Sequence, residues 1–292
     1  MRWLTAGLLG AIAAFGVSTS AAAQNRRPIE IVRALDLDSA IVGSIRVHFL
    51  ADDREHALRL AALCDEAVSF FKDEFSPALS LRLAVLRPPQ WFVPYAGGDG
   101  EPYGIPWSWV PDALITVPAS LDVGVLITGP DRSADLRRVQ FVMLHELGHL
   151  ASKQLLHPNR GESFSSLRWF DELIATYFAY AFIQARDPRW VHAAQEEWQG
   201  LVESFTPSVV SLDWSHFRDL SPEEFAQTYG WYQNLLNLRA AALYEEYGLD
   251  FLRRIRDRLD WQNSANWTTD GLIPILDDLA PGFQAWASAL EG

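Results

Sequence analysis

The sequence has little cysteine and little positive charge, and each shortage excludes a class of protein. Its single cysteine, Cys64, rules out an intrachain disulfide framework and any metal site built from several cysteines. Residues 57–68 have the apolar spacing of an amphipathic helix, so we expect a small buried thiol. Arg and Lys total 24 against 37 Asp and Glu, which gives a net charge of −13. A chain this acidic lacks the basic surface that nucleic acids require, so we expect no nucleic-acid partner.

Long hydrophobic runs are also missing beyond the N-terminus. After residue 23 no apolar stretch reaches the roughly 20 residues that a membrane-spanning helix needs. The one apolar run, residues 4–17, follows Arg2 and precedes three alanines at residues 21–23. This layout predicts a signal peptide at residues 1–23 and an exported protein, periplasmic or secreted. If the segment stays uncleaved, it is an N-terminal anchor and the only expected membrane contact.

The rest of the chain has the patterning of a folded α+β protein. Hydrophobic residues make up 49% and charged residues 21%, and neither a repeat nor a Pro/Gly linker divides residues 24–292, which we interpret as one domain. Alternating apolar residues predict strands at residues 45–50, 80–86 and 113–118. Helical spacing predicts helices at residues 53–75, 134–155, 167–184, 188–203, 222–247, 249–259 and 271–279, with a last short helix ending at residue 290.

These elements predict a small N-terminal sheet with a helix on one face, followed by a mainly helical C-terminal half. Residues 87–109 are rich in proline, glycine and aromatic residues, which favours a long loop. The aromatic residues of this stretch either line a substrate cleft or cover the sheet, and the sequence leaves both readings open. They are Trp91, Tyr95, Tyr103, Trp107 and Trp109.

Residues 145–149 read His-Glu-Leu-Gly-His. The four-residue spacing places the imidazoles of His145 and His149 on one face of a helix, where both can bind one metal ion. Neutral imidazole is a preferred ligand of zinc. Glu146 can reach a water molecule on the metal without binding the metal itself, which suits a general base. Apolar neighbours at helical spacing favour a built site over two incidental histidines.

A catalytic zinc needs a third protein ligand and one open position. The extended metzincin pattern would place glycine and histidine where the chain has Ser152 and Leu155, so that class is excluded. His157 is near the motif but out of register with it. Glu172 is the better candidate, because it begins the next predicted helix, whose first turn can face the first one. Alternatively, Asp171 and Glu172 only compensate the dipole at the N-terminus of that helix.

The two segments together resemble a known family. His-Glu-x-x-His at 145–149 followed by Trp-Phe-Asp-Glu-x-x-Ala-x-Tyr at 169–177 is similar to the gluzincin metallopeptidases, in particular their compact peptidase MA-like domains. The resemblance spans roughly residues 45–259 and implies a zincin-like fold with one Zn²⁺ per chain. The implied metal ligands are His145, His149 and Glu172.

The resemblance also implies a transition-state donor and a substrate-binding strand. In related enzymes a tyrosine at the start of a later helix donates its hydroxyl to the developing oxyanion, and here Tyr229 is the first choice and Tyr232 the second. Residues 103–118 end in an extended stretch where relatives place a strand that pairs with the substrate main chain. Asp171 and Thr176 depart from the family pattern, in which many relatives have asparagine and some an acidic residue.

These features predict a zinc metallopeptidase acting on a peptide or protein substrate, with Glu146 as general base and then proton donor to the leaving amine. The alternative is a catalytically inactive, zinc-stabilised module that binds a peptide or partner in the cell envelope. The altered residues around the ligands and the lack of a recognisable aminopeptidase loop suggest it. A hydrolase of a non-peptide amide, such as a cell-wall crosslink, would use the same attack chemistry. The sequence leaves open the oligomeric state and the choice between endo- and exo-cleavage.

Overall fold

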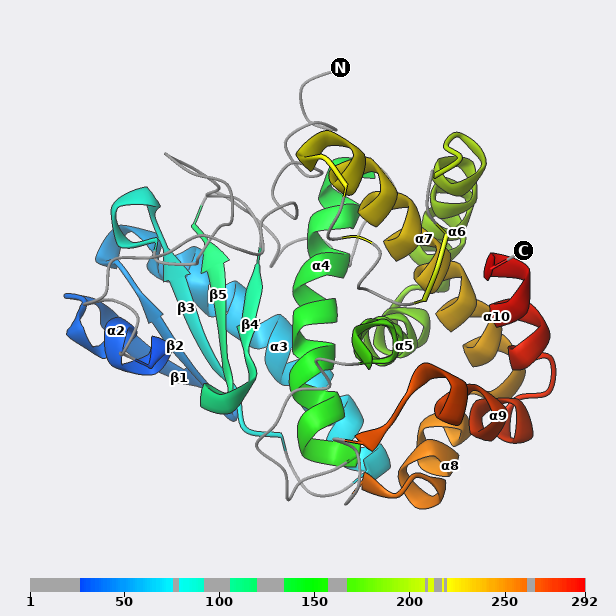
Figure 1. The fold of residues 1–292 in the computed structure, drawn as a ribbon. Helices are drawn as coiled ribbons and strands as arrows, with labels where there is room; N and C mark the ends of the chain where they lie inside the picture. The colour runs from blue at the N-terminus through cyan, green and yellow to red at the C-terminus, as the bar shows by residue number, and fades with distance from the viewer. Residues whose placement is uncertain are drawn as a thin grey trace.

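The computed structural model describes residues 27–75, 79–91, 106–119, 134–156, 167–207, 210–212, 217, 220–261 and 266–291, and these form the expected α+β fold (Figure 1). The predicted signal peptide, residues 1–23, lies outside the described residues, as do Tyr95, Tyr103 and His157. Within the described part, no helix is both long enough and apolar enough to cross a membrane.

Five strands form one mixed sheet in the order β1-β2-β3-β5-β4. Their bounds are β1 (Asp38–Val42), β2 (Ile45–Phe49), β3 (Arg82–Leu86), β4 (Trp107–Trp109) and β5 (Leu114–Pro118). The three central strands are parallel to one another and are the three that the sequence predicts. β1 and β4 pair antiparallel at the two edges.

Helices cover both faces of this sheet. On one face α3 (Arg54–Phe75) packs against the inward side chains of the central strands, with Cys64 fully buried, as expected. Burial raises the pKa of the Cys64 thiol to about 12. On the other face α2 (Pro28–Ala34) inserts Val32 against β3 and β5. Trp91 and Trp109 pack beside Val32, so these two aromatic side chains cover the sheet.

Two expectations for this half are wrong. Residues 87–109 are not a continuous loop, because they contain β4 and a short 3₁₀ turn at Pro88–Gln90. The stretch Leu114–Pro118 is not a strand edge open to a substrate, because it lies between β3 and β4 with all five residues buried. The edge strand next to Leu114–Pro118 is β4, and a strand of three residues is too short to show an alternating pattern. The short elements α2 and β1 are also absent from the sequence prediction.

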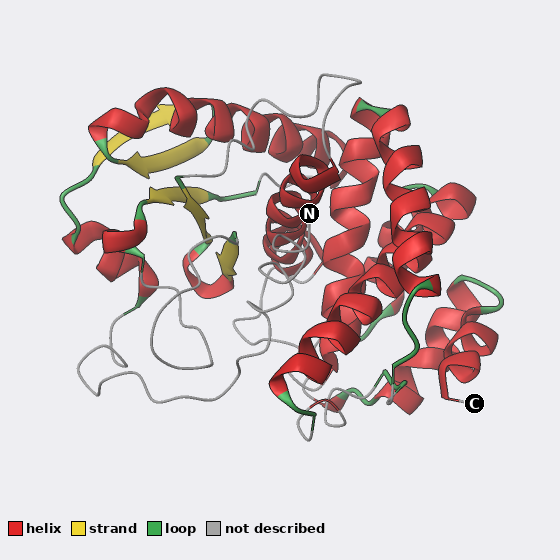
Figure 2. Ribbon diagram, turned by 90° about the horizontal axis from the view of Figure 1, so that it is seen from above, coloured by secondary structure: helices red, strands yellow, loops and turns green. Residues whose placement is uncertain are grey.

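The C-terminal half is helical, as predicted. Its elements are α4 (Ala134–Ala151) with a π-helical continuation (Ser152–Leu156), α5 (Arg168–Arg186), α6 (Pro188–Glu203), α7 (Pro222–Tyr247), α8 (Asp250–Arg258), α9 (Thr269–Leu279) and α10 (Phe283–Glu291). α4 stands between the sheet and the remaining helices of this half, α5 to α10 (Figure 1). The view from above shows α3 reaching from the sheet to the helical half (Figure 2).

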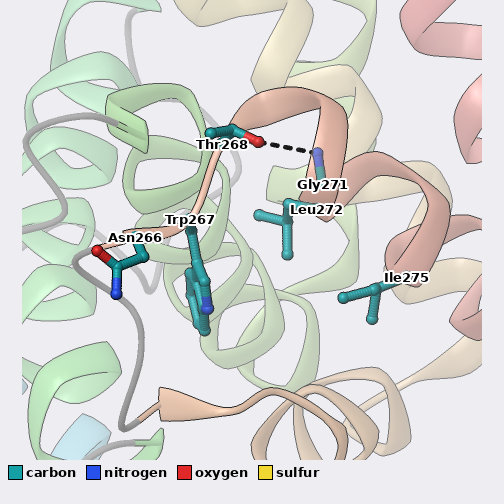
Figure 3. A pocket seen from close by; sticks show the side chains of 6 residues that line it. All are labelled: Asn266, Trp267, Thr268, Gly271, Leu272 and Ile275. Carbon is teal, nitrogen blue, oxygen red and sulfur yellow. Dashed lines mark hydrogen bonds between the residues drawn. The ribbon is translucent and has the colours of Figure 1, made fainter.

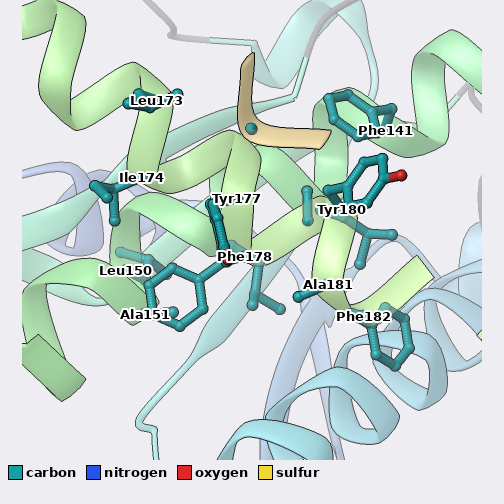
Figure 4. Packing of buried hydrophobic residues seen from close by; sticks show 14 of the residues in the cluster. Phe141, Leu150, Ala151, Leu173, Ile174, Tyr177, Phe178, Tyr180, Ala181 and Phe182 are labelled. Carbon is teal, nitrogen blue, oxygen red and sulfur yellow. The ribbon is translucent and has the colours of Figure 1, made fainter. Parts of the chain in front are cut away.

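One apolar core runs through both halves. Buried aromatic and aliphatic side chains of α5 fill its centre (Figure 4). Phe178 of α5 meets Phe71 of α3 edge to face, with ring centroids 4.9 Å apart. α4 and α5 pack closely where Gly148 faces Ala175, because a β-carbon at Gly148 would lie 2.2 Å from the Ala175 carbonyl oxygen. The glycine of the His-Glu-Leu-Gly-His segment therefore sets the distance between the two helices that carry the candidate ligands.

Candidate metal centre

Three candidate ligands converge from α4 and α5. His145 Nε2 lies 3.0 Å from Glu172 Oε2, and His149 Nε2 lies 3.8 Å from the same oxygen. The two imidazole rings are one helical turn apart, with centroids 4.7 Å apart and planes nearly perpendicular. The structure thus brings together the residues that the sequence singles out as ligands.

The opposite nitrogen of each ring has its own partner. His145 Nδ1 lies 3.1 Å from the hydroxyl of Thr176, and His149 Nδ1 lies 3.3 Å from Asp171 Oδ2. Both rings therefore turn Nε2 towards Glu172 and Nδ1 towards a fixed polar side chain. Such contacts orient histidine ligands in metal sites.

The electrostatics of this cluster favour positive charge at its centre. Burial by itself lowers the pKa of His149, but the carboxylate of Asp171, with smaller effects of neighbouring glutamates, raises it to about 10. Burial raises the pKa of Glu172, but the hydrogen bond from His145 and the charge of both histidines lower it to about 2. The negative electrostatic potential of these carboxylates, which favours protonated imidazoles, also favours a divalent cation bound between the two histidines.

Glu146 lies beside this cluster, and the sheet holds it there. One ligand atom of each of His145, Glu146 and His149 lies within 4.8 Å of the others. Glu146 Oε2 accepts a hydrogen bond of 2.8 Å from the backbone N–H of Ser108 in β4. Glu172 Oε2 lies near both Nε2 atoms, so the carboxylates of Glu146 and Glu172 both border the histidine pair.

Tyr229 also belongs to the cluster. Its side chain is hydrogen-bonded to Arg168 and interacts electrostatically with Glu172 and Glu146. Burial raises the pKa of Tyr229, which keeps its hydroxyl protonated and able to donate. Tyr232 interacts electrostatically with Glu172 but is more deeply buried, at 1% exposure against 7% for Tyr229. Of the two candidates, Tyr229 is thus the less deeply buried.

The donors fit a zinc ion. Two imidazole nitrogens and one carboxylate oxygen are a ligand set of catalytic zinc sites. With bonds of about 2.0–2.2 Å in a tetrahedral arrangement, two such ligands lie about 3.3 Å apart, between the two distances found here. Among the described residues, the one group of three or more His, Cys, Asp and Glu side chains whose ligand atoms all lie within 4.8 Å of one another is His145, Glu146 and His149, and Glu172 joins it through its contacts with the two Nε2 atoms. Cys64 is buried in α3 and is not part of this group.

Several contributors to the site escape prediction from the sequence. Arg168, four residues before Glu172 on α5, contacts the other oxygen of that carboxylate, with 3.4 Å between Nε and Oε1. Gln233 and Asn237 of α7 bond to Thr176, and Ser108 contributes only its backbone. The four-residue spacing of Tyr229, Gln233 and Asn237 is the one sequence signal that points to such a polar face.

A separate hollow opens at the start of α9, where the Thr268 side chain caps the helix by accepting from Gly271 N–H at 3.1 Å (Figure 3). It contains no titratable side chain and none of the residues of the metal cluster. Its lining residues are Asn266, Trp267, Thr268, Gly271, Leu272 and Ile275.

The chain matches none of the protein-family models and none of the curated proteins with which it was compared. The gluzincin resemblance therefore stays an expectation based on residues 145–149 and 169–177. Functional conclusions depend on the geometry of the cluster.

Proposed function

We propose that this protein is an exported zinc metallopeptidase whose catalytic domain has a zincin-like fold. The observation that carries the proposal is the convergence of His145 Nε2 and His149 Nε2 on one oxygen of Glu172, with Glu146 alongside. An α-helix with this histidine spacing and a carboxylate from a second helix supply two imidazoles and one carboxylate, one of the three-ligand sets that hold a catalytic zinc. Export rests on the signal pattern of residues 1–23 alone.

In this proposal His145, His149 and Glu172 hold the metal. When bound, zinc supplies Lewis acidity that activates water and polarises the substrate carbonyl. Glu146 takes a proton from the attacking water and then delivers it to the leaving amine. The Ser108 amide orients the Glu146 carboxylate for both transfers through the 2.8 Å hydrogen bond.

Tyr229 and Arg168 stabilise charge that develops during attack. The buried Tyr229 hydroxyl donates to the oxyanion, and Arg168 orients that hydroxyl through their hydrogen bond. Arg168 also contacts Glu172 and offsets part of its negative charge. The short edge strand β4 lies beside Glu146, so an extended peptide that adds to this edge would reach the base.

The first test is the zinc content of the mature protein, measured by elemental analysis. We expect about one zinc per chain. Glu172→Ala should bind zinc far more weakly, whereas Glu196→Ala should bind it normally, because the Glu196 side chain is 72% exposed on α6. A wild-type chain that takes up no zinc when it is supplied would contradict the proposal. Full retention by Glu172→Ala would place the third ligand elsewhere, with Asp171 and His157 next to test.

The second test separates an enzyme from a binding module. Glu146→Gln should keep its zinc and lose about 10²–10⁴-fold in the rate of peptide hydrolysis, the usual contribution of a general base. If the variant cleaves every substrate as fast as the wild type, the mechanism is wrong. A zinc-loaded wild type that cleaves no peptide but hydrolyses a cell-wall amide crosslink would redirect the same chemistry to another substrate. Partner binding without any hydrolysis would favour the inactive module.

A further inference from the structure

A chain of neutral side chains extends from the far side of the His145 ring. His145 Nδ1 lies 3.1 Å from Thr176 Oγ1, and the Thr176 hydroxyl donates to Asn237 Oδ1 at 3.2 Å. The side-chain amide of Gln233 donates to the same hydroxyl at 3.2 Å. Thr176 is fully buried and Asn237 is 4% exposed. Groups so far from solvent depend on one another for their hydrogen bonds.

The hydrogen bonds of the Thr176 hydroxyl determine whether His145 Nδ1 donates or accepts. A hydroxyl has one hydrogen to donate and two lone pairs with which to accept. The hydrogen goes to Asn237 and one lone pair accepts from Gln233, so the second lone pair faces His145 Nδ1. Nδ1 must therefore carry a hydrogen. A neutral imidazole with its hydrogen on Nδ1 has its free lone pair on Nε2, and a metal ion held by both residues would then lie between that lone pair and the carboxylate of Glu172, taking the place of their direct contact.

We propose that Thr176, Gln233 and Asn237 form a neutral relay that positions His145 for metal binding, an inference that rests on the proposed zinc site. The relay fixes which ring nitrogen is available to the metal and holds the plane of the ring. His149 is held by a different kind of partner, the carboxylate of Asp171. One histidine is thus fixed by a neutral relay and the other by a charged group.

The relay also connects the metal ligands to α7. Tyr229, Gln233 and Asn237 are spaced four residues apart on this helix, so they share one face. Thr176 belongs to α5 and His145 to α4, and the hydrogen bonds join all three helices at the level of the ligands. The helix that presents Tyr229 is therefore held in register with His145.

The test compares zinc affinity in three variants by competition with a chromophoric chelator. Thr176→Val keeps the shape of the side chain but removes the hydroxyl, and we expect about 10- to 100-fold weaker zinc binding. Thr176→Ser restores the hydroxyl and should stay within a few-fold of the wild type. The control is Thr228→Val, the same change at a threonine that is also buried and whose hydroxyl has no hydrogen-bond partner among the described residues. It should bind zinc normally.

A second readout reports the ring itself. Long-range ¹H–¹⁵N correlation spectra of the histidines should show the hydrogen of His145 on Nδ1 in the wild type and in Thr176→Ser. If Thr176→Val does not fold, Gln233→Met removes one donor at the half-buried end of the relay and should weaken zinc binding in the same direction.

Wild-type zinc affinity in a folded Thr176→Val would overturn the relay while the proposed zinc site stands. A hydrogen on Nε2 rather than Nδ1 in the wild type would overturn it as well. A wild type that binds no zinc would overturn the proposed function instead, so the two failures are distinguishable.

Discussion

The sheet half and the helical half of the molecule bury polar side chains in different ways. In the sheet half, among the described residues, these are Asp112 and Thr116. Asp112 accepts from Arg27 and from the backbone of Ile29, and Thr116 bonds to two residues of β4. Each joins neighbouring pieces of the frame, so the buried polar groups of this half fasten α2 and β4 to the sheet.

In the helical half, by contrast, four of the buried polar side chains form one connected cluster. His145, Glu172, Thr176 and Asn237 are linked by hydrogen bonds across three helices. Burying these four polar groups together is tolerated because each has a hydrogen-bond partner within the cluster. Among the described residues, the sheet half is linked to the candidate site by the amide nitrogen of Ser108, which donates to Glu146 beside this cluster. One half is therefore a frame, and the spacing of the helices in the other half positions the candidate ligands.

The largest effect should come from changing that spacing. Gly148→Ala places a methyl group against the Ala175 carbonyl, so α4 and α5 must separate. We expect a loss of about 2–3 kcal/mol in the free energy of unfolding, together with weaker zinc binding. The matched control is Gly200→Ala in α6, where nothing lies within 4 Å of the added carbon. It should gain about 0.5–1 kcal/mol, because alanine favours a helix. Urea unfolding measures the stability of each variant, and competition with a chelator measures its zinc affinity. Equal changes in Gly148→Ala and Gly200→Ala would contradict the role of the close contact between α4 and α5.

A smaller, purely catalytic effect is expected at α7. Tyr229→Phe should lower kcat about 100-fold, the usual cost of removing one oxyanion donor, with zinc content unchanged. Tyr232→Phe should stay within a few-fold of the wild type. Steady-state kinetics of the two zinc-loaded variants give their kcat values. A large loss in Tyr232→Phe with little change in Tyr229→Phe would identify Tyr232 as the donor.

A still smaller effect should follow from the one contribution of the sheet half. Ser108→Pro removes the backbone N–H that donates a hydrogen bond to the Glu146 carboxylate. Proline is tolerated in an edge strand such as β4. We expect kcat to fall about tenfold, which corresponds to a loss of about 1.5 kcal/mol, the lower end of the range for a hydrogen bond to a charged group. Ser108→Ala keeps the amide and should be silent. Equal kcat values for the two variants would show that the amide does not orient the base.

The smallest signal should come from Cys64, in the frame. Its raised pKa means that the folded thiol is protonated at pH 8, where about one molecule in ten thousand is a thiolate. The unfolded thiol, with a pKa near 8.5, is ionised to about a quarter at that pH. Alkylation followed by mass spectrometry should therefore label Cys64 in denaturant and leave it unlabelled in native buffer. Rapid labelling of the native protein would show that α3 opens easily.

The helices were predictable because their signals are local. Residues 188–203 and 222–247 coincide with α6 and α7, where Asp187 and Ser221 cap the first turns and proline occupies the first helical position. The paired histidines were predictable for the same reason, since one helix fixes their spacing. Glu172 followed from its place at the start of the next helix.

What the sequence could not provide depends on contacts between distant segments. β4 became visible only through its pairing with β5, because three residues contain too little alternation. Ser108 takes part through a backbone atom, which no side-chain pattern reports. Gln233 and Asn237 are 57 and 61 residues from Thr176, and only the packing of α7 on α5 brings them to it.

The main-chain contact between Ser108 and Glu146 has a consequence for how such a protein diversifies. Every residue type except proline supplies the same amide hydrogen. In the proposed enzyme, the side chain at position 108 can therefore change to suit a new substrate while Glu146 keeps its orientation. The proposal thus makes selectivity and catalysis separable at this position.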